Sequence, residues 1–241
     1  MRYGIFSDIH ANLEALESVE EALSREKIDL SLCTGDIIGY GADPEACIKK
    51  TRGITKLIIG GNHDAAVIGT TDTRFFNSAA RRAVLWTRER LVPKDENFLK
   101  KMKLVYKNTE LEMVHGTLYE PELFHYMLDA QAAYTTFSLM KRNICFVGHT
   151  HSPGIFALKS GTVSYLTKGT YSFSRGEKLI VNTGSVGQPR DGDPRASYCI
   201  YDTEKRLVEI KRCPYDIAKA QKKIVEAGLS ESLAKRLSEG A

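Results

Sequence analysis

The sequence has 241 residues, with 34 Lys and Arg against 30 Asp and Glu, so its formal net charge is +4 when His is counted as neutral. With 42% hydrophobic and 27% charged residues, its composition excludes a wholly disordered chain. No apolar run approaches the roughly 18 residues of a membrane helix, and the first residues show no signal-peptide pattern. Five scattered Cys without a Cys-x-x-Cys motif argue against a disulfide scaffold. We therefore expect a cytoplasmic protein that does not bind membranes.

Short apolar runs alternate with helical patterns in the first part of the chain. Runs at 3–7, 30–34 and 56–59 predict strands, and the patterns at 12–25 and 44–50 predict helices. Asn12 is a suitable N-cap for the first helix. Strands that alternate with helices indicate βαβ units and a parallel core sheet.

A basic helical segment is expected next, at 77–103, as two helices separated at Pro93. It carries eight Lys and Arg against three acids. Two interpretations remain open for these charges: a solvated helical face, or a docking surface for a polyanion.

The remainder of the chain predicts further strands and a helical end. We expect strands at 110–114 and 144–147 with a helix at 129–141 between them. Short β-runs with Gly-rich turns across 154–213 predict a second, more antiparallel sheet. The tail, 214–241, is expected to be helical with a break at Gly228. We expect one domain, 1–241, with two layered sheets.

Asp, Asn and His residues follow the predicted strands. Because ligands of open α/β sheets bind at the carboxyl ends of the strands, we expect these residues to gather at one sheet edge. Carboxylate, amide and imidazole ligands together suit divalent transition metals. The segments are Ser7-Asp8-Ile9-His10, Gly35-Asp36, Gly60-Gly61-Asn62-His63-Asp64, Val114-His115-Gly116 and Gly148-His149-Thr150-His151.

The spacing within these segments has a physical reason. Residues i and i+2 of an extended chain project to the same side, so Asp8 with His10, and His149 with His151, can each present two ligand heads together. Asp-x-His alone is a weak signal, but composition places Gly-Asn-His-Asp in fewer than about one random chain in a thousand.

This ordered set resembles the motifs of the calcineurin-like metallophosphoesterase superfamily, in particular its compact prokaryotic phosphodiesterase branch. The resemblance extends from residue 3 to about residue 190 and includes the later Asn182-Thr183-Gly184-Ser185 loop. It implies an α/β four-layer sandwich of two mixed β-sheets flanked by helices, with two divalent metal ions. Mn²⁺ is the first choice, with Fe, Ni, Co, Zn and Mg as alternatives.

The resemblance also implies a role for each motif residue. One metal would be held by Asp8, His10, Asp36 and His151, and the other by Asp36, Asn62, His115 and His149. A hydroxide that bridges the two ions would attack phosphorus. His63 would face the substrate without binding a metal and, if protonated, could supply a proton to the leaving group. Asp64 would orient the His63 ring through the far imidazole nitrogen and favour its cation.

Other residues near the motifs have two interpretations each. Family members that act on phosphoproteins carry an Arg shortly after the second motif, whereas this chain has Gly39-Tyr40-Gly41, so a phosphoprotein substrate is disfavoured. Tyr40 would either stack on a substrate ring or simply pack. Arg190 would either clamp a phosphate oxygen or form a surface salt bridge. His125 matches no motif and is expected to pack.

These features favour a phosphodiesterase that acts on a small or nucleotide-derived diester. Two alternatives stay open: a nuclease on single-stranded nucleic acid, suggested by the basic 77–103 segment, and a non-catalytic protein-binding scaffold of the same fold. A scaffold has no chemical need for His63.

Overall fold

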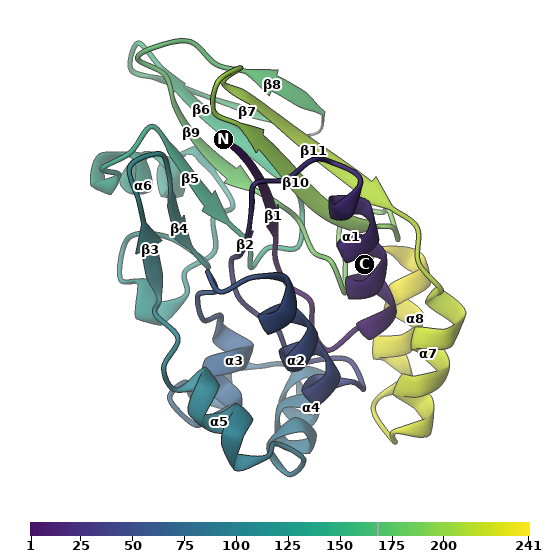
Figure 1. Ribbon diagram of the computed structural model, residues 1–241. Helices are drawn as coiled ribbons and strands as arrows, with labels where there is room; N and C mark the ends of the chain where they lie inside the picture. The colour runs from purple at the N-terminus through teal and green to yellow at the C-terminus, as the bar shows by residue number, and fades with distance from the viewer. Residues whose placement is uncertain (168) are drawn as a thin grey trace.

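Two β-sheets pack face to face in the centre of the molecule, and helices cover their outer faces (Figure 1). The computed structural model describes residues 1–167 and 169–241. The helices are α1 (Leu13–Ser24), α2 (Pro44–Ile54), α3 (Asn62–Val67), α4 (Ser78–Arg88), α5 (Pro93–Leu99), α6 (Ala130–Leu139), α7 (Ile217–Glu226) and α8 (Glu231–Glu239), with short 3₁₀ turns η1 (Thr73–Phe75) and η2 (Pro121–Leu123). This is the four-layer α/β sandwich that the motifs implied.

The first sheet joins the two ends of the chain. Its order is β2-β1-β10-β11-β8, and only β1 and β2 run parallel. Its strands are β1 (Arg2–Phe6), β2 (Leu30–Cys33), β8 (Thr170–Ser172), β10 (Ala196–Asp202) and β11 (Leu207–Cys213).

The second sheet contains the middle of the chain. Its order is β3-β4-β5-β9-β6-β7, with a parallel centre of β4, β5 and β9 and antiparallel flanks. Its strands are β3 (Val105–Lys107), β4 (Glu112–Val114), β5 (Ile144–Val147), β6 (Gly154–Lys159), β7 (Thr162–Leu166) and β9 (Lys178–Asn182).

The central strands are apolar on both faces because both faces are covered. In β5, Ile144 and Phe146 enter the core between the two sheets, whereas Cys145 and Val147 pack on the α6 side. In β1, Tyr3 and Ile5 belong to the same inter-sheet core. Because successive side chains point to opposite faces, the central strands of the second sheet pack against the first sheet on one face and against α6 on the other.

Two sequence-based expectations about the sheets were wrong. The strands of 154–213 do not form a sheet of their own, because β8, β10 and β11 extend the first sheet and β6, β7 and β9 extend the second. The run at 56–59 forms only isolated bridges, from Ile58 to Cys33 and from Ile59 to Lys103. This run is too short for a ladder, because Gly60 and Gly61 follow and the chain enters α3 at once.

The helical expectations for the rest of the chain are confirmed. The 77–103 segment forms α4 and α5, and Pro93 occupies the first turn of α5, where its missing N–H has no partner to lose. The tail forms α7 and α8, separated at Gly228, whose φ of 71° lies in the left-handed region. Among the described residues, no helix combines the length and the apolar character needed to cross a membrane.

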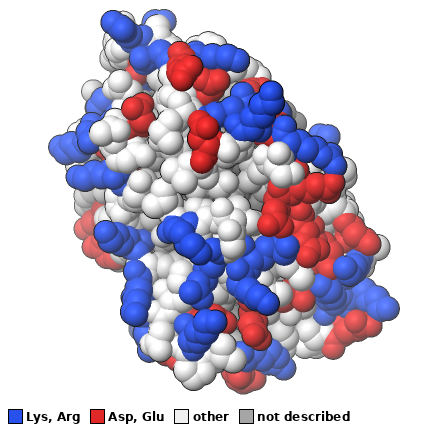
Figure 2. Space-filling model, in the orientation of Figure 1, with Lys and Arg blue, Asp and Glu red and all other residues white. Residues whose placement is uncertain are grey.

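Charge is unevenly distributed over the surface. Figure 2 shows Lys and Arg side chains gathered over α2 and α5, while Asp and Glu gather over α1. The basic character expected of 77–103 is therefore part of a wider basic face, to which Lys49 and Arg52 of α2 also contribute.

Phe146→Ala tests the core between the sheets. Phe146 is fully buried there, so we expect the substitution to lower the free energy of unfolding by about 3–5 kcal/mol. Tyr134→Ala on α6, where the side chain is 53% exposed, is the matched control and should change it by less than about 0.5 kcal/mol. Urea unfolding of the two variants checks this; equal effects would contradict the layer assignment.

Candidate metal centre

Six of the seven expected metal ligands lie in loops that follow four strands, and the seventh, Asn62, is the first residue of α3. Asp8 and His10 follow β1, and Asp36 follows β2; both strands belong to the first sheet. His115 follows β4, and His149 and His151 follow β5, in the second sheet. The expectation of a single sheet edge was therefore wrong: the residues meet between the ends of two sheets, because β4 and β5 do not pair with β1 and β2.

Backbone hydrogen bonds join these loops beyond the ends of the strands. His10 N donates to Asp36 O (3.0 Å), which continues the parallel pairing of β1 with β2. Gly148 N donates to His115 O (2.9 Å) in the same way in the second sheet. His149 N donates to the Asp8 carboxylate (3.1 Å to Oδ2) and joins the two sheets. The loops are thus parts of one rigid bonded unit.

Five of the expected ligands have left-handed backbone conformations that non-glycine residues rarely adopt. Such strain persists only where the surrounding structure holds it, and it clusters at functional sites. The φ angles are 54° at Asp8, 50° at His10, 52° at Asp36, 70° at His149 and 61° at His151.

Two glycines allow the loops to approach closely. A Cβ atom added to Gly61 would collide with Asp36 Oδ1, and one added to Gly148 would collide with Ser7 Oγ and Asp8 Oδ2. No side chain fits at either position without displacing an expected ligand.

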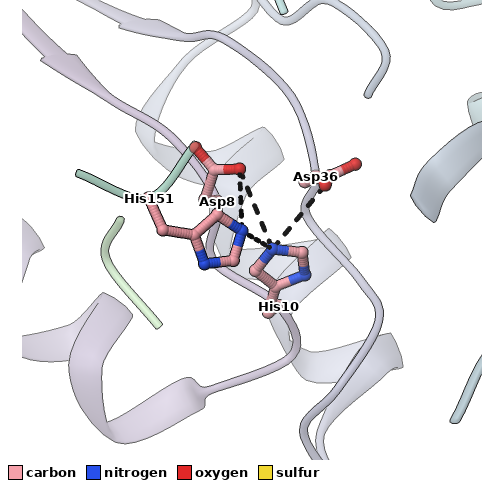
Figure 3. A group of neighbouring side chains, drawn as sticks. All are labelled: Asp8, His10, Asp36 and His151. Atoms are coloured by element: carbon pink, nitrogen blue, oxygen red, sulfur yellow. Dashed lines mark hydrogen bonds and ion pairs between the residues drawn. The ribbon is translucent and has the colours of Figure 1, made fainter. Parts of the chain in front are cut away.

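One group of ligand atoms comprises Asp8, His10, Asp36 and His151, all buried and within 4.8 Å of one another (Figure 3). Asp8 Oδ1 lies 3.4 Å from His151 Nε2, and His10 Nε2 lies 3.6 Å from Asp36 Oδ2. The two Nε2 atoms of His10 and His151 are 2.9 Å apart.

The contact between these two Nε2 atoms suits a bound cation. His10 Nδ1 donates to Ile38 O (3.3 Å) and His151 Nδ1 donates to Gln188 O (2.6 Å). A carbonyl oxygen only accepts, so in a neutral ring each Nε2 is a bare acceptor. Burial lowers the pKa of both imidazoles well below the usual value, which keeps them neutral. Two lone pairs therefore face each other, and a metal ion bound by both would remove the repulsion.

A second group comprises Asp36, His115 and His149, again buried and within 4.8 Å of one another. His115 Nε2 lies 3.3 Å from Asp36 Oδ2 and 3.2 Å from Asn62 Oδ1, so the amide of Asn62 joins this group. His149 Nε2 is buried and has no hydrogen-bond partner among the described residues. Asp36 belongs to both groups, which is the position of a bridging ligand.

The carboxylates and His115 titrate far from their ordinary ranges. Burial raises the pKa of Asp8 to about 6. Burial also opposes the charge on Asp36, but attraction to His115 and His63 holds the pKa of Asp36 well below its usual range. Burial likewise disfavours the His115 cation, yet Asp36 and Asp8 together raise the pKa of His115 to about 9. Among the imidazoles of this centre, His115 is thus the one whose positive charge offsets the negative charge of the buried carboxylates.

These two groups fit divalent metal ions. Nitrogen and oxygen ligands about 2.1 Å from an ion lie roughly 3.0–3.5 Å from one another, and the closest contacts here run from 2.9 to 3.6 Å. The second nitrogen of His115 donates to Thr34 O (2.8 Å), as is usual for a metal-binding imidazole. Oxygen and imidazole without thiolate is the ligand chemistry of Mn, Fe, Co, Ni and Zn.

The expected hydrogen bond between Asp64 and His63 is not formed. Asp64 lies in the first turn of α3, and its carboxylate accepts from the backbone N–H groups of Ile37 (3.0 Å), Ile38 (3.3 Å) and Gly61 (3.1 Å) instead. Burial, with Asp36 next in effect, raises the pKa of Asp64 to about 7. Asp64 therefore holds the metal-site loops together rather than orienting the His63 ring.

Burial disfavours the protonated form of His63, the form in which the ring could supply a proton to the leaving group. Burial lowers the pKa of His63 to about 4, so its ring is neutral at neutral pH. Its Nδ1 has no hydrogen-bond partner among the described residues. The ring packs between His10, Tyr40 and Phe76, with centroid distances of 4.5–4.9 Å.

Tyr40 and Arg190 lie beside the centre and bind each other. The Tyr40 ring is only 6% exposed and packs on His10 and His63. Arg190 Nη2 donates to Tyr40 Oη (3.1 Å) and to Gln188 Oε1 (3.0 Å). Substrate contact by either residue stays a prediction, and this network holds the Gln188 loop whose carbonyl orients His151.

A cavity of about 690 Å³ opens directly against the centre. Asn62, His63 and His149 line its polar side. Phe76 and Tyr126, which the sequence patterns did not single out, line the cavity beside these polar groups. The only sequence feature that could have indicated this cavity is the presence of large apolar residues in short segments otherwise rich in polar residues. The expectation that His125 packs was wrong, because its side chain is exposed and paired with Glu120 (3.2 Å) at the surface.

Comparisons with known proteins agree with this geometry. Residues 1–206 match the model of the calcineurin-like phosphoesterase superfamily domain. An uncharacterized protein of Methanocaldococcus jannaschii is 36% identical over 237 residues, which cover 97% of this chain and 96% of that protein. The crystal structure of a metallophosphoesterase from Sphaerobacter thermophilus is 36% identical with a TM-score of 0.86, over 100% of this chain and 99% of that one.

A hypothetical protein from Pyrococcus horikoshii shares the fold, with a TM-score of 0.81 at 17% identity over 100% of this chain and 98% of that chain. The family resemblance carried by the strand-end motifs is thus confirmed. The chain belongs to the calcineurin-like phosphoesterase superfamily and has the fold of its metallophosphoesterases.

Proposed function

We propose that this protein is a phosphodiesterase that depends on two divalent metal ions and hydrolyses a small or nucleotide-derived diester. The observation that carries the proposal is the pair of bare imidazole nitrogens on His10 and His151, beside two buried carboxylates, next to a cavity of about 690 Å³. A cavity of this size accommodates a nucleotide-sized molecule.

The two groups of ligands described above would hold one ion each, with Asp36 between them. Bound there, two ions would acidify a water molecule to supply the nucleophile and would polarise the phosphoryl oxygens. Mn²⁺ is the ion that we propose first, because the set mixes carboxylate and amide oxygens with imidazoles.

The chain's own residues bind and orient the phosphoryl group. Asn62, His63 and His149 are the polar groups on the cavity side of the centre. His63 is neutral and not part of either ligand group, so its ring N–H is free to donate to a phosphoryl oxygen. Asn62 contributes oxygen without charge, which avoids repelling an anionic substrate.

The charge of the cavity walls favours a diester over a monoester. A phosphomonoester carries about −1.5 to −2 charges at pH 7, whereas a diester carries one. Asp72 and Glu122 line the cavity, and no Lys or Arg does so in the part of the chain that the structure describes. The extra charge of a monoester would therefore have no cationic side chain to meet it.

Asp36→Ala tests the proposed bridging ligand. Since Asp36 belongs to both groups, we expect the variant to lose both ions, measured by elemental analysis, and to lose hydrolysis of bis(4-nitrophenyl) phosphate in Mn²⁺. Asp72→Asn, at the cavity mouth, should keep both ions. A variant that retains two ions at full occupancy would contradict the bridging position.

The same assay distinguishes the alternatives. Single-stranded DNA cleaved in preference to small diesters would favour a nuclease that uses the basic face over α2 and α5. Two bound ions without turnover of diester, monoester or DNA would favour the protein-binding scaffold.

His63→Ala tests the proposed donor. We expect it to retain both ions, because His63 is in neither ligand group, and to lower kcat by about 10²–10³-fold, the usual effect of removing one donor to a developing oxyanion. Metal analysis beside kinetics checks both parts. Loss of the ions in this variant would contradict a role in substrate binding.

A further inference from the structure

The cavity beside the metal centre has an apolar wall that phosphoryl chemistry does not need. Phe75 and Phe76 come from one segment and Leu123 and Tyr126 from another, and all four line the same cavity. Phe75 is 88% exposed, Leu123 57% and Tyr126 50%. Large apolar side chains that stay exposed together at the mouth of a cavity mark a binding surface.

This wall is attached to the centre by ring contacts. Tyr126 stacks on His149, with centroids 3.9 Å apart and an interplanar angle of 16°. Phe76 packs on His63, with centroids 4.9 Å apart. A group bound to the wall therefore lies next to the residues that would hold the phosphoryl group, within the span of one small substrate.

The loop that carries Tyr126 is held in a strained conformation. Glu120 (φ 45°) and Phe124 (φ 51°) flank η2 in the left-handed region. Phe124 is buried and meets the His115 ring edge-on, with centroids 6.0 Å apart. The buried ring anchors the loop, so Leu123 and Tyr126 remain at the cavity mouth.

The charge of the cavity excludes further phosphates from the group that binds there. The acids on the walls are Asp72, which is paired with Arg74 (2.6 Å), and Glu122, for which the described residues provide no ion pair. No Lys or Arg lines the cavity within the described ranges, 1–167 and 169–241, and the nearby Arg74 is paired with Asp72, so a second phosphate would meet no unpaired cationic side chain in the lining.

We infer that this apolar wall is a subsite for the non-reacting arm of the substrate, and that the arm ends in an uncharged aromatic ring. The inference rests on the proposed phosphodiesterase activity and names its substrate class: a diester with a single phosphate and an aromatic arm, of which a nucleoside is the biological form. Flat rings on Phe75, Phe76 and Tyr126 match an aromatic ring by stacking, and stacking accepts any base.

Diesters that share the 4-nitrophenolate leaving group but differ in the retained arm test this inference. The arms are methyl, hexyl and 5′-thymidyl, so differences in kcat/KM report the arm alone. We expect the thymidyl ester to exceed the methyl ester by about 10-fold or more and to exceed the hexyl ester. A 3′-phosphate added to the thymidyl arm should lower kcat/KM. Equal values for methyl and thymidyl, or a preference for hexyl, would overturn the aromatic subsite.

Phe75→Ala assigns the preference to this wall. Phe75 is almost wholly exposed, so the variant should fold normally, and we expect the thymidyl-to-methyl ratio to fall several-fold. Tyr134→Ala removes an equally large exposed ring outside the cavity and should keep the ratio. A ratio that Phe75→Ala leaves unchanged would place the arm elsewhere.

Binding of thymidine to the metal-free protein supplies a readout that needs no turnover. Saturation-transfer NMR should detect contact with the nucleoside, which is weakened in Phe75→Ala and retained in Tyr134→Ala. No contact would count against the subsite. Failure of the methyl ester to react in Mn²⁺ would instead count against the proposed function, and the NMR result would still decide the subsite.

Discussion

The carboxylates of Asp8 and Asp36 are buried where water cannot solvate them, and the rest of the structure depends on how their charge is compensated. Around them are imidazoles that burial keeps neutral, apart from His115. One imidazolium does not balance two carboxylates in such a site. Divalent ions would balance them and would also bind the lone pairs of the facing nitrogens of His10 and His151.

This arrangement needs both sheets in register. The first ligand group draws on β1 and β2 with one residue from β5, and the second adds the loop after β4. The bond from His149 N to Asp8 crosses from one sheet to the other. The core between the sheets, built from residues such as Phe146, is therefore what sets the distance between the ligand groups. Left-handed φ angles at Asp8 and His149 indicate that the loops are held by these contacts and not by local preference.

The sequence predicted most of the local structure and the membership of the site, because each depends on short-range patterns. Apolar runs predicted the central strands, and the polar motifs that follow them predicted which residues lie close together in the structure. The division of the 154–213 strands between two sheets could not be predicted, because strand pairing is decided by packing between distant segments.

Neither the hydrogen-bond partners of Asp64 nor the residues of the cavity wall could be predicted from the sequence, for different reasons. Asp64 is one residue from His63, but its position in the first turn of α3 directs its carboxylate back to the N–H groups of Ile37, Ile38 and Gly61. Phe75 ends the short 3₁₀ turn η1 and Tyr126 lies in a loop, and in neither segment does a periodicity distinguish a packed ring from a substrate contact. Only the structure, in which both rings line the same cavity, identifies them as candidate substrate contacts.

The attraction of phosphate esters and the selection among them would then come from different parts of the site. Metal ions bound at the centre would attract any phosphate ester, so they would not discriminate among substrates. Discrimination falls to the cavity walls, which offer aromatic rings and acids but, among the described residues, no cation. The basic face over α2 and α5 contributes no residue to this lining, although Lys and Arg gather there. A long polyanion held on that face would have to leave it to reach the centre through an apolar mouth. The charge pattern therefore favours a substrate with a single phosphate over nucleic acid, even though the net charge of +4 alone would suggest the opposite.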